Sequence, residues 1–516
     1  MIRAVRHVVR LFGIAHRLGQ YDALFLLKRF GIAPTVTAAA GLFARRPRGI
    51  AALRPGQRLA LAIQGLGPSF IKFGQILSTR SDLLGEDIAT DLAELQDSLP
   101  PFSGAEARAI IAREFGRPLE TLFAQFDEVP VAAASIAQVH MAVTADGREV
   151  AVKVLRPGIE EAFTRDLGLF FWLATIAEGT GPRMRRLRPI EVVQTMADTV
   201  AMEMDLRFEA AAASELAENF KDDPTFRVPK IDWTRTSKRV LTLERVIGIP
   251  IDERERIVAA GHDPRDVLAK AGAALFHQAF RDGFFHADLH PGNLFVDTQG
   301  NVVAVDFGIM GRLDKHTRNY LADMLLGFMT GDYRAAAEAH FKAGYVPAHK
   351  SVTAFTQACR SIAEPILGLP LHEISVARLL GQLFHVAETF EMETQPQLLL
   401  LQKSMLIAEG VGRKLEPSVN MWELARPLIE TLMRENRGPQ ARLREVATET
   451  LGTLERLPTV LAGLEATLGM LSSGGLQLHP NTVRALTEAS GRDNKAYLWA
   501  LWVAVALIAL IAFTQV

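Results

Sequence analysis

The sequence predicts an α+β protein with two lobes, a small β-rich lobe followed by a large helical one. Residues 138–143 and 150–154 are largely apolar segments joined by a short polar turn, which is typical of a β-hairpin. A third strand-like segment, 239–246, precedes a Gly-Ile-Pro break. Two short ones, 293–296 and 302–305, flank another polar turn, and helical periodicity fills most of the remaining chain.

Length, charge and cysteine content narrow the class of protein. The 516 residues are enough for two or three domains, and 49% of them are apolar, which favours helix-rich packing or a membrane segment. A net charge of −1 gives no electrostatic reason to expect nucleic-acid binding. The single cysteine, Cys359, excludes an intramolecular disulfide framework, and we expect a small buried side chain rather than a catalytic thiol.

Three polar residues with a characteristic spacing lie in the second half of the chain. Asp288 belongs to the segment HADLHPGN, Asn293 ends that segment, and Asp306 begins a DFG triplet further on. Phosphoryl-transfer enzymes of the protein-kinase fold need such a set. One carboxylate orients the nucleophile, while a carboxamide and a second carboxylate hold Mg²⁺ against the nucleotide phosphates. We therefore expect Asp288 to orient a nucleophile and Asn293 and Asp306 to bind magnesium.

A lysine on the second strand of the predicted hairpin completes this set. Lys153 ends the run Val-Ala-Val-Lys and is expected to neutralise charge on the α- and β-phosphates. A carboxylate from a nearby helix must fix its pose, and Glu203, Asp205 and Glu209 lie on one predicted helix. Six residues turn a helix by about 240°, so Glu203 and Glu209 cannot both face the lysine. Which of them does so is left open by the pattern.

The segment before the hairpin is rich in alanine where ordinary kinases have a GxGxxG loop over the phosphates. Alanine methyl groups restrict φ and prevent the close backbone approach that glycine permits. Phosphate binding should therefore be differently posed, and transfer to a bulky acceptor less efficient. The expected nucleotide contacts are Ala132, Ala133, Ala134, Ser135 and Lys153, together with Glu244 and Val246 at the end of the third strand-like segment.

Both ends of the chain suggest contact with a membrane. Residues 496–516 are uncharged and, as a helix, would span roughly 31 Å at about 1.5 Å per residue, close to the hydrocarbon thickness. Arg484, Arg492 and Lys495 precede this tail, so the body is expected on the cytoplasmic side. A buried C-terminal helix is the alternative. Residues 1–30 form either a basic amphipathic helix on anionic lipid or a surface helix packed on the main domain.

One further pattern lies in a predicted helix near the N-terminus. Lys72 and Gln75 are one turn apart in the segment FIKFGQ and project from the same helix face. The motifs common to protein kinases do not include these two residues, and two unrelated surface residues could have the same spacing.

These residues together resemble the UbiB family of atypical protein-kinase-like proteins, also called ABC1 or ADCK. The resemblance covers residues from about 55 to 311. The shared signatures are the KxGQ motif (72–75), the segment 95–101, the alanine-rich loop with 135–140, the lysine strand 152–158, the ExD motif (Glu203 and Asp205) and the catalytic loop 286–293.

The resemblance implies a KxGQ helix over the active cleft, with Lys72 and Gln75 in the site and approaching Glu203 and Asp205. Glu209 then becomes the partner of the strand lysine. It also implies ATP or ADP and Mg²⁺ as ligands. A helix at that place blocks a peptide substrate, which favours an ATPase or an enzyme acting on a small molecule.

Bacterial members of the family support ubiquinone biosynthesis at the membrane. The implied partners are membrane lipid, prenyl-quinone precursors and other ubiquinone biosynthesis proteins, and the implied location is the bacterial inner membrane. The alternatives are a kinase that transfers the γ-phosphate to a hydroxyl acceptor, and a nucleotide-sensing scaffold for lipid-modifying enzymes.

The expected organisation is a protein-kinase-like two-lobe fold with additions at both ends. Its segments are a basic amphipathic N-terminus (1–54), a helical KxGQ extension (55–125), a kinase-like small lobe (126–247), a helical large lobe with the catalytic loop (248–471), a linker (472–495) and a transmembrane helix (496–516).

Overall fold

The computed structural model describes most of the chain up to residue 428. The described residues are 2–25, 47, 49–78, 85–93, 99–179, 189–366, 382, 385–387, 389–392, 395–419 and 427–428. They all belong to one compact unit, Met1–Leu432. The expected linker 472–495 and membrane helix 496–516 lie outside these ranges, so both stay predictions. Within the described ranges, no helix has both the length and the apolar character that a membrane crossing requires.

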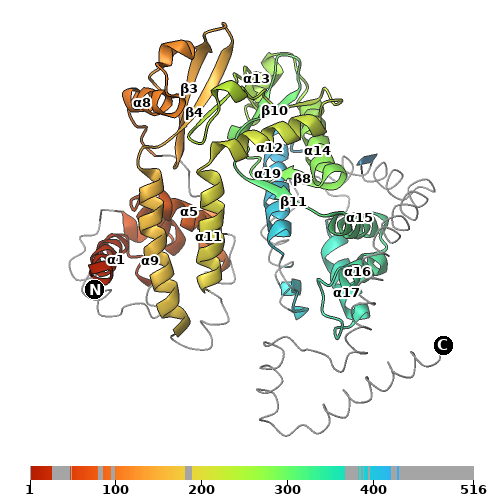
Figure 1. Cartoon of the computed structure of the whole chain (residues 1–516). Helices are drawn as coiled ribbons and strands as arrows, with labels where there is room; N and C mark the ends of the chain where they lie inside the picture. Colours follow the sequence, from red (N-terminus) through yellow and green to blue (C-terminus); the bar gives the residue numbers. More distant parts are fainter. Residues whose placement is uncertain are drawn as a thin grey trace, which may run out of the picture. The chain divides into compact units, whose positions relative to one another are not determined.

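The small lobe is built on an antiparallel sheet with the strand order β1-β3-β4-β6 (Figure 1). Its strands are β1 (Phe123–Phe126), β3 (Ala137–Thr144), β4 (Glu149–Leu155) and β6 (Val240–Glu244), and the short β2 (Ala132–Ala133) pairs with β3. The pairing of β3 with β4 confirms the predicted hairpin, and β6 confirms the third strand.

Helix α8 (Gly104–Phe115) packs against this sheet (Figure 1). Its buried Ile111 shares a hydrophobic core with Val152 and Val154 of β4. Successive side chains of a strand point to opposite faces. The residue between these two valines, Lys153, therefore faces away from α8, and the burial of the valines fixes the direction of the lysine.

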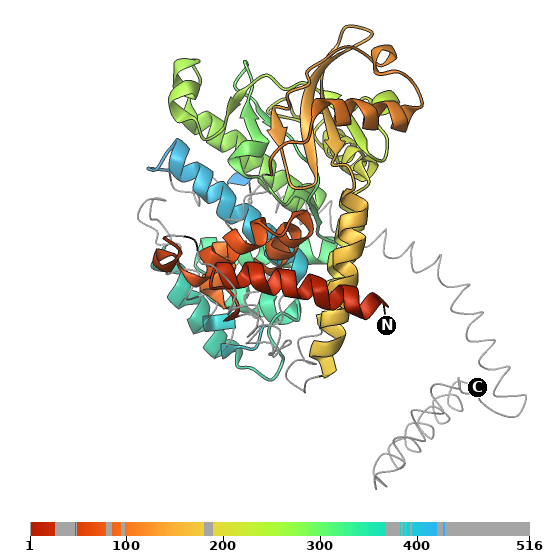
Figure 2. The same cartoon turned by 90° about the vertical axis from the view of Figure 1, so that its left-hand side faces the viewer.

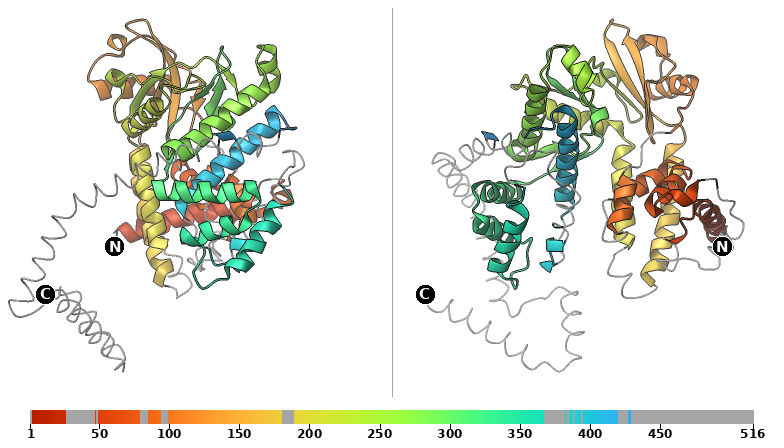
Figure 3. Two further views of the ribbon diagram at one scale, coloured as in Figure 1. Left: turned by 90° about the vertical axis from the view of Figure 1, so that its right-hand side faces the viewer. Right: turned by 180° about the vertical axis from the view of Figure 1, so that it is seen from behind.

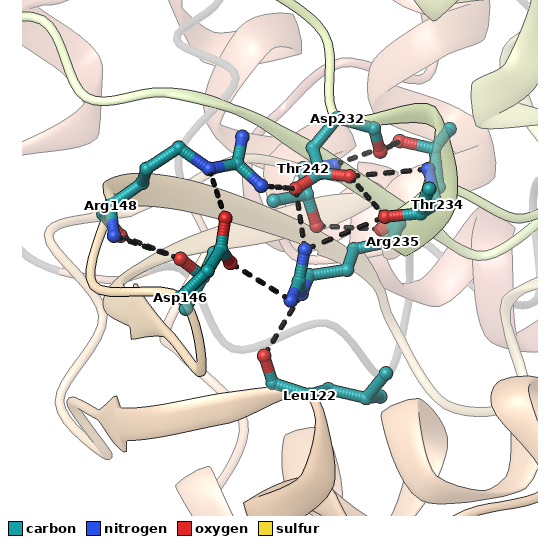
Figure 4. Close-up of polar contacts among 9 residues, drawn as sticks. Leu122, Asp146, Arg148, Asp232, Thr234, Arg235 and Thr242 are labelled. Atoms are coloured by element: carbon teal, nitrogen blue, oxygen red, sulfur yellow. Dashed lines mark hydrogen bonds and ion pairs between the residues drawn. The ribbon is translucent and has the colours of Figure 1, made fainter.

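The hairpin turn between β3 and β4 is held by an ion-pair network (Figure 4). Arg148 donates to the carboxylates of Asp146 (2.6 Å) and Asp232 (2.8 Å). Arg235 also donates to Asp232 (2.8 Å) and Asp146 (3.1 Å), and to the backbone oxygen of Leu122 (2.9 Å). The network thus fastens the outer end of the hairpin to the segment that leads into β6.

Helices from two separate stretches of sequence form a shared core beside the small lobe. The stretch before the sheet contributes α1 (Ile2–Gln20), α4 (Pro55–Gln64), α5 (Pro68–Ser78) and α7 (Glu86–Ala93), with the 3-10 turn η1 (Ile50–Ala52) ahead of α4. The stretch between β4 and β6 contributes α9 (Ile159–Gly179) and α11 (Pro189–Glu203). Phe70 and Phe73 of α5 contact Phe170 of α9, with ring centroids 5.0 and 4.6 Å apart. The helix that carries the KxGQ motif is thereby fixed against α9.

The N-terminal helix α1 packs on the body of the protein, beside α9 (Figure 2). Its Ile14 and Leu18 are buried in the shared core. Arg10 forms an ion pair with Asp166 of α9, with 3.2 Å between the nitrogen and the oxygen. For α1, the helix that the structure describes within residues 1–30, this packing supports the second interpretation, a surface helix on the main domain.

The prediction that Glu203, Asp205 and Glu209 lie on a single helix is wrong. Helix α11 ends at Glu203, and α12 (Leu206–Asn219) begins after a break. Asp205 has extended backbone angles and is the N-cap of α12, since its carboxylate accepts a hydrogen bond from Arg207 N. The sequence did not reveal this break because it is short and each flanking helix buries one face, so the helical spacing of apolar residues continues across it.

The large lobe combines helices with two small sheets. One has the order β5-β10-β9-β7 and the other pairs β8 with β11. The strands are β5 (Phe226–Arg227), β7 (Ile249–Pro250), β8 (Phe284–His286), β9 (Leu294–Val296), β10 (Val302–Ala304) and β11 (Met310–Arg312). The β9–β10 hairpin confirms the prediction. The sequence pattern did not reveal β5, β7, β8 and β11, which are only two or three residues long.

The helices of the large lobe follow and interleave with these strands. They are α13 (Arg254–Ala259), α14 (Pro264–Phe276), the π-helix η4 (His277–Asp282), α15 (Lys315–Thr330), α16 (Tyr333–Lys342), α17 (Val352–Ala363) and α19 (Pro396–Leu415), with 3-10 turns η2 (Leu119–Thr121), η3 (Trp233–Arg235) and η5 (Pro291–Asn293) elsewhere. Helices α15, α16 and α17 stack on one another (Figure 3). Cys359 is buried in α17, where burial raises the pKa of its thiol to about 12, as expected for a packing residue.

Candidate phosphoryl-transfer site

Lys153 meets two carboxylates that come from different parts of the fold. Its Nζ lies 2.8 Å from Glu209 Oε1 and 3.0 Å from Asp306 Oδ1. Glu209 is in the first turn of α12, and Asp306 follows β10. Of the helix carboxylates left open by the sequence, Glu209 is therefore the one that pairs with the strand lysine. The structure brings Lys153, Glu209 and Asp306 together, and the pairing with Glu209 is the one that the family resemblance implied.

The shared ammonium changes the acid–base character of all three groups. Burial alone lowers the pKa of Lys153, but the charges of Asp306 and Glu209 outweigh it and hold that pKa above its ordinary value. Burial raises the pKa of Glu209 to about 7, against the opposing charge of Lys153. Asp306 also loses hydration, yet the lysine charge keeps its pKa well below the ordinary value. The lysine charge thus favours the ionised form of Asp306, whereas burial favours the protonated form of Glu209.

The catalytic loop is anchored by a buried histidine. His286 Nδ1 accepts a hydrogen bond from Asp288 N at 3.1 Å, so this nitrogen carries no proton. Its Nε2 then donates to Val305 O at 3.3 Å. Burial lowers the pKa of His286, which favours this neutral form. The expectation that His286 packs under the loop is confirmed, and the ring fixes Asp288 relative to the strand end before Asp306.

Asn293 and Asp306 lie at the open end of the β9–β10 hairpin. Val305 N donates to Asn293 O at 2.9 Å, which places Asp306 directly beyond the paired position. Asn293 Nδ2 donates to Asp288 O at 3.0 Å, so its side-chain oxygen stays free to accept or to bind a cation. Asp306 has φ +61°, an uncommon left-handed conformation for a non-glycine residue that turns its carboxylate toward Lys153.

The donor set of this hairpin end fits Mg²⁺. A carboxylate and a carboxamide oxygen are hard ligands, and Mg²⁺ usually takes few protein ligands and completes its shell with water and phosphate. About 45% of the Asp306 side chain is exposed, so a cation can reach it. Within the described residues, no group of three or more His, Cys, Asp and Glu side chains forms a metal site.

Sequence reasoning missed one residue at this site. Lys403 of α19 places its Nζ 2.8 Å from Asp288 Oδ1. The next residue, Ser404, is buried, and its hydroxyl lies within hydrogen-bond distance of His286 O (3.2 Å) and of Leu400 O in its own helix (3.1 Å). No local pattern could have identified Lys403, because it lies far along the chain from the catalytic loop in an ordinary helical segment.

The alanine-rich loop is an extended edge of the small sheet. Ala132 and Ala133 of β2 pair with Val139 and Gln138 of β3. Arg156 donates to Ala134 O at 2.8 Å and also to the backbone oxygens of Leu99 and Pro100. The loop is therefore held in an extended conformation by strand pairing and by Arg156, which agrees with the expected restriction of its backbone. Ser135 is fully buried beneath it.

The KxGQ helix reaches the ExD motif through one of its two polar residues. Lys72 Nζ lies 3.0 Å from Glu203 Oε2, and each side chain is only 9% exposed. Asp205 instead caps α12 and pairs with Arg207, with 2.6 Å between oxygen and nitrogen. Gln75 is half-buried on the same helix as Lys72. The implied approach of Lys72 to the motif is present, whereas the Asp205 carboxylate is engaged elsewhere.

Glu244 is the last residue of β6, and Val246 lies in the connection that follows it. The Glu244 carboxylate accepts from Arg227 (2.8 Å) and from Lys230 N (3.3 Å). Val246 is half-buried in the segment that leads to β7. The Glu244 side chain is thus engaged with protein groups, and a nucleotide contact at Glu244 and Val246 stays a prediction.

The sequence matches two known protein families over most of the described chain. Residues 94–340 match the ABC1 atypical kinase-like domain, and residues 359–420 match the UbiB helical domain. Lys403 lies in the second of these regions, whereas Lys153, Asp288 and Asp306 lie in the first.

Relatives and one solved structure support the same assignment. The Probable protein kinase UbiB of Marinobacter nauticus is 44% identical over 442 residues, which cover 84% of this chain and 81% of the relative. The protein with the same name from Xanthomonas axonopodis pv. citri is 45% identical and covers 80% of this chain and 75% of the relative. The complex structure of Rv3197 with erythromycin from Mycobacterium tuberculosis has a TM-score of 0.53 and 27% identity, and covers 69% of this chain and 90% of that chain. The chain belongs to the UbiB family of ABC1 atypical kinase-like proteins.

Proposed function

We propose that this protein is a Mg²⁺-dependent ATPase of the atypical kinase type. The observation that carries the proposal is the convergence on Lys153 of Glu209 from α12 and Asp306 from the β9–β10 hairpin. Phosphoryl transfer depends mainly on positioning and on charge neutralisation rather than on covalent chemistry by the protein. A fixed ammonium, an ionised carboxylate and the nearby Asp288 are the groups that such a reaction requires.

Each polar side chain of the site has a distinct task in this proposal. Lys153 binds the α- and β-phosphates, and Glu209 holds it in position. Asn293 and Asp306 hold Mg²⁺, which when bound neutralises and orients the phosphate oxygens. Asp288, fixed through its backbone by His286, orients the attacking water.

The KxGQ helix supports water or a small molecule as the acceptor. Phe70 and Ile71 of α5 share a hydrophobic core with Ile136 and Ala137, which follow the alanine-rich loop. The buried Lys72 pair adds a second fixed contact to α11. We propose that this rigidly held helix limits access by a folded protein acceptor.

We further propose that the activity supports ubiquinone biosynthesis at the bacterial inner membrane. The name UbiB of the relatives and the uncharged tail 496–516 support this role. Membrane lipid and prenyl-quinone precursors are then the partners, with the catalytic body on the cytoplasmic side. ATP hydrolysis by the full chain should rise with anionic liposomes or with a phenol that resembles a quinone precursor. A rate indifferent to both additions would argue against the lipid-linked role.

The ATPase proposal is tested by Asp306→Asn in the full-length protein. The variant loses the charge that faces the metal, so Mg²⁺-dependent phosphate release should disappear. Asp314→Asn is the matched control, because Asp314 caps α15 away from the site and asparagine is an equally good cap. Turnover by Asp306→Asn equal to that of the wild type would reject the assignment.

A kinase with a hydroxyl acceptor is the second candidate. Asp288 would serve a hydroxyl as well as a water, and the relatives carry the name Probable protein kinase UbiB. Incubation with γ-labelled ATP separates the two candidates, because a kinase puts the label on an acceptor and an ATPase releases it as phosphate. A protein that binds ATP and gives neither product would fit the third possibility, a nucleotide-sensing scaffold.

A further inference from the structure

We propose that Lys403 is a phosphate-binding cation of this site, supplied by α19. In the absence of nucleotide it pairs with Asp288, and when ATP is bound it contacts the terminal phosphate. The inference rests on the proposed nucleotide site and assigns to it a residue outside the kinase-like domain. Cations delivered from a separate segment are an established means of stabilising phosphoryl transfer.

Two consecutive residues of α19 contact the catalytic loop, in different ways. Ser404 is fully buried, and its hydroxyl is shared between His286 O of the loop (3.2 Å) and Leu400 O of its own helix (3.1 Å), so it packs the helix against the loop. Lys403 pairs with Asp288 at 2.8 Å, yet 44% of its side chain is exposed. The helix is thus anchored by the serine, while the ammonium stays accessible to a ligand.

The other ammonium groups near the site are already matched by carboxylates. Lys153 is shared between Glu209 and Asp306. Lys72 is paired with Glu203. An incoming triphosphate brings several negative charges, so a cation at its terminal phosphate adds to the neutralisation that Mg²⁺ and these two lysines supply.

The catalytic loop itself supplies no permanent cation. Residues 286–293 contain no lysine or arginine. His290 Nε2 lies 4.0 Å from Asp288 Oδ2, but a histidine ring carries a charge only when it is protonated, whereas a lysine is charged throughout the neutral range. The permanent positive charge next to Asp288 therefore comes from Lys403 of α19 and not from a residue of the catalytic loop.

The position of Lys403 suits contact with the transferred phosphate. Asp288 orients a nucleophile toward the terminal phosphorus, so a cation bound to Asp288 lies beside that phosphate. An ammonium has three N–H donors, and Asp288 is the partner of Lys403 among the residues that the structure describes. The remaining donors can bind phosphate oxygens while the contact with Asp288 is kept.

The alternative is that Lys403 only forms a surface ion pair, which contributes little to stability. The same helix offers a matched pair of this kind. Lys414 lies 2.9 Å from Asp252, and the two side chains are 59% and 28% exposed, against 44% and 27% for Lys403 and Asp288. Lys414→Met therefore removes an equivalent ion pair from the last turn of α19 without touching the catalytic loop.

The test compares the affinities of ATP and ADP, each with Mg²⁺, for the full-length wild type and its variants. Lys403→Met should weaken ATP binding about tenfold relative to ADP binding, because ADP lacks the terminal phosphate. It should also lower kcat by about 10- to 100-fold. Lys403→Arg keeps the charge and should retain most of the preference for ATP, and Lys414→Met should match the wild type. An unchanged ATP-to-ADP affinity ratio in Lys403→Met would overturn the proposal.

A second measurement uses the wild type alone and does not depend on the folding of a variant. Acetylation of lysine amines is followed by mass spectrometry with Mg²⁺ and either ATP or ADP. ATP should protect Lys403 more than ADP does, and Lys414 should react equally in both. Equal reactivity of Lys403 with the two nucleotides would contradict the contact. Neither readout requires turnover, so a wild type without ATP hydrolysis refutes the ATPase proposal and leaves the role of Lys403 to be decided by these data.

Discussion

Lys72 and Glu203 form an ion pair at 3.0 Å in which each side chain is only 9% exposed. The pair joins the KxGQ helix α5 to the last residue of α11. Glu203 lies just before the junction with α12, whose first turn carries Glu209, the partner of Lys153. The KxGQ helix is thus connected through one short junction to the carboxylate that positions the strand lysine.

Removal of one charge of this pair should destabilise the protein. Lys72→Met leaves Glu203 buried without its cation, and the expected loss is about 3 kcal/mol in the free energy of unfolding. The double variant Lys72→Met/Glu203→Gln buries no unpaired charge and should recover at least half of that loss. Urea unfolding followed by tryptophan fluorescence measures both.

The control for this prediction is an exposed pair. Arg334 and Glu338 form an ion pair with side chains 78% and 41% exposed, so Arg334→Ala should change stability by less than about 0.5 kcal/mol. A Lys72→Met variant as stable as this control would mean that the Lys72 pair is not buried in solution.

The pKa of Glu209 predicts a dependence of stability on pH. Folding raises this pKa from an ordinary value of 4.5 to about 7, so the folded state holds the proton more tightly. The resulting stabilisation is complete below about pH 4.5 and is lost as the pH rises through 7. The glutamine of Glu209→Gln cannot ionise. As the pH is raised from 5 to 8, the Tm of the wild type should therefore fall relative to the Tm of this variant.

Glu215→Gln is the control for the titration of Glu209, since Glu215 lies on the same helix in an exposed pair with Arg312. Its Tm should follow that of the wild type across this range. Parallel Tm curves for the wild type and Glu209→Gln would show that Glu209 does not titrate there.

His286 predicts an opposite trend in acid. Burial lowers its pKa, so folding favours the neutral ring, and stability is lost as the pH falls below the unfolded value of about 6.5. His286→Asn keeps an acceptor for Asp288 N but does not titrate. The variant should be less stable than the wild type at pH 7.5 and should lose less Tm between pH 6.5 and pH 5.

An exposed histidine gives the comparison for this acid effect. His349 is 66% exposed and lies 3.6 Å from the exposed Glu391, so His349→Asn should change stability by less than about 0.5 kcal/mol. If His286→Asn also follows the wild type in acid, the ring of His286 is not the group whose protonation weakens the fold.

The alanine-rich loop predicts an effect on nucleotide preference. Ala132 lies in β2, which pairs with β3 and restricts the loop to an extended conformation. Ala132→Gly relaxes this restriction and lets the backbone approach the phosphates, so the ratio of ATP to ADP affinity should change about threefold or more. Nucleotide titrations measure this ratio.

Ala145→Gly is the matched control, because Ala145 lies in the exposed turn between β3 and β4. Its nucleotide affinities should equal those of the wild type. If neither affinity changes in Ala132→Gly, the loop does not cover the phosphates.

The sequence alone was sufficient for the parts of the site that depend on local order. The alternation of Val152, Lys153 and Val154 determines which face of β4 carries the lysine. The β9–β10 hairpin likewise holds Asn293 and Asp306 at its open end, because the turn between the strands fixes their register. These features arise from the period of a strand and the geometry of a turn, both of which are visible in adjacent residues.

Only the tertiary structure decided the contacts between distant elements. The break that makes Asp205 a helix cap selects Glu209, rather than Glu203, as the partner of Lys153, and it depends on how α11 and α12 pack. Lys403 reaches Asp288 because α19 buries Ser404 against the loop, 118 residues from His286 in sequence. Such contacts result from the burial of apolar faces throughout the lobe, and a local pattern of residues does not record which faces meet.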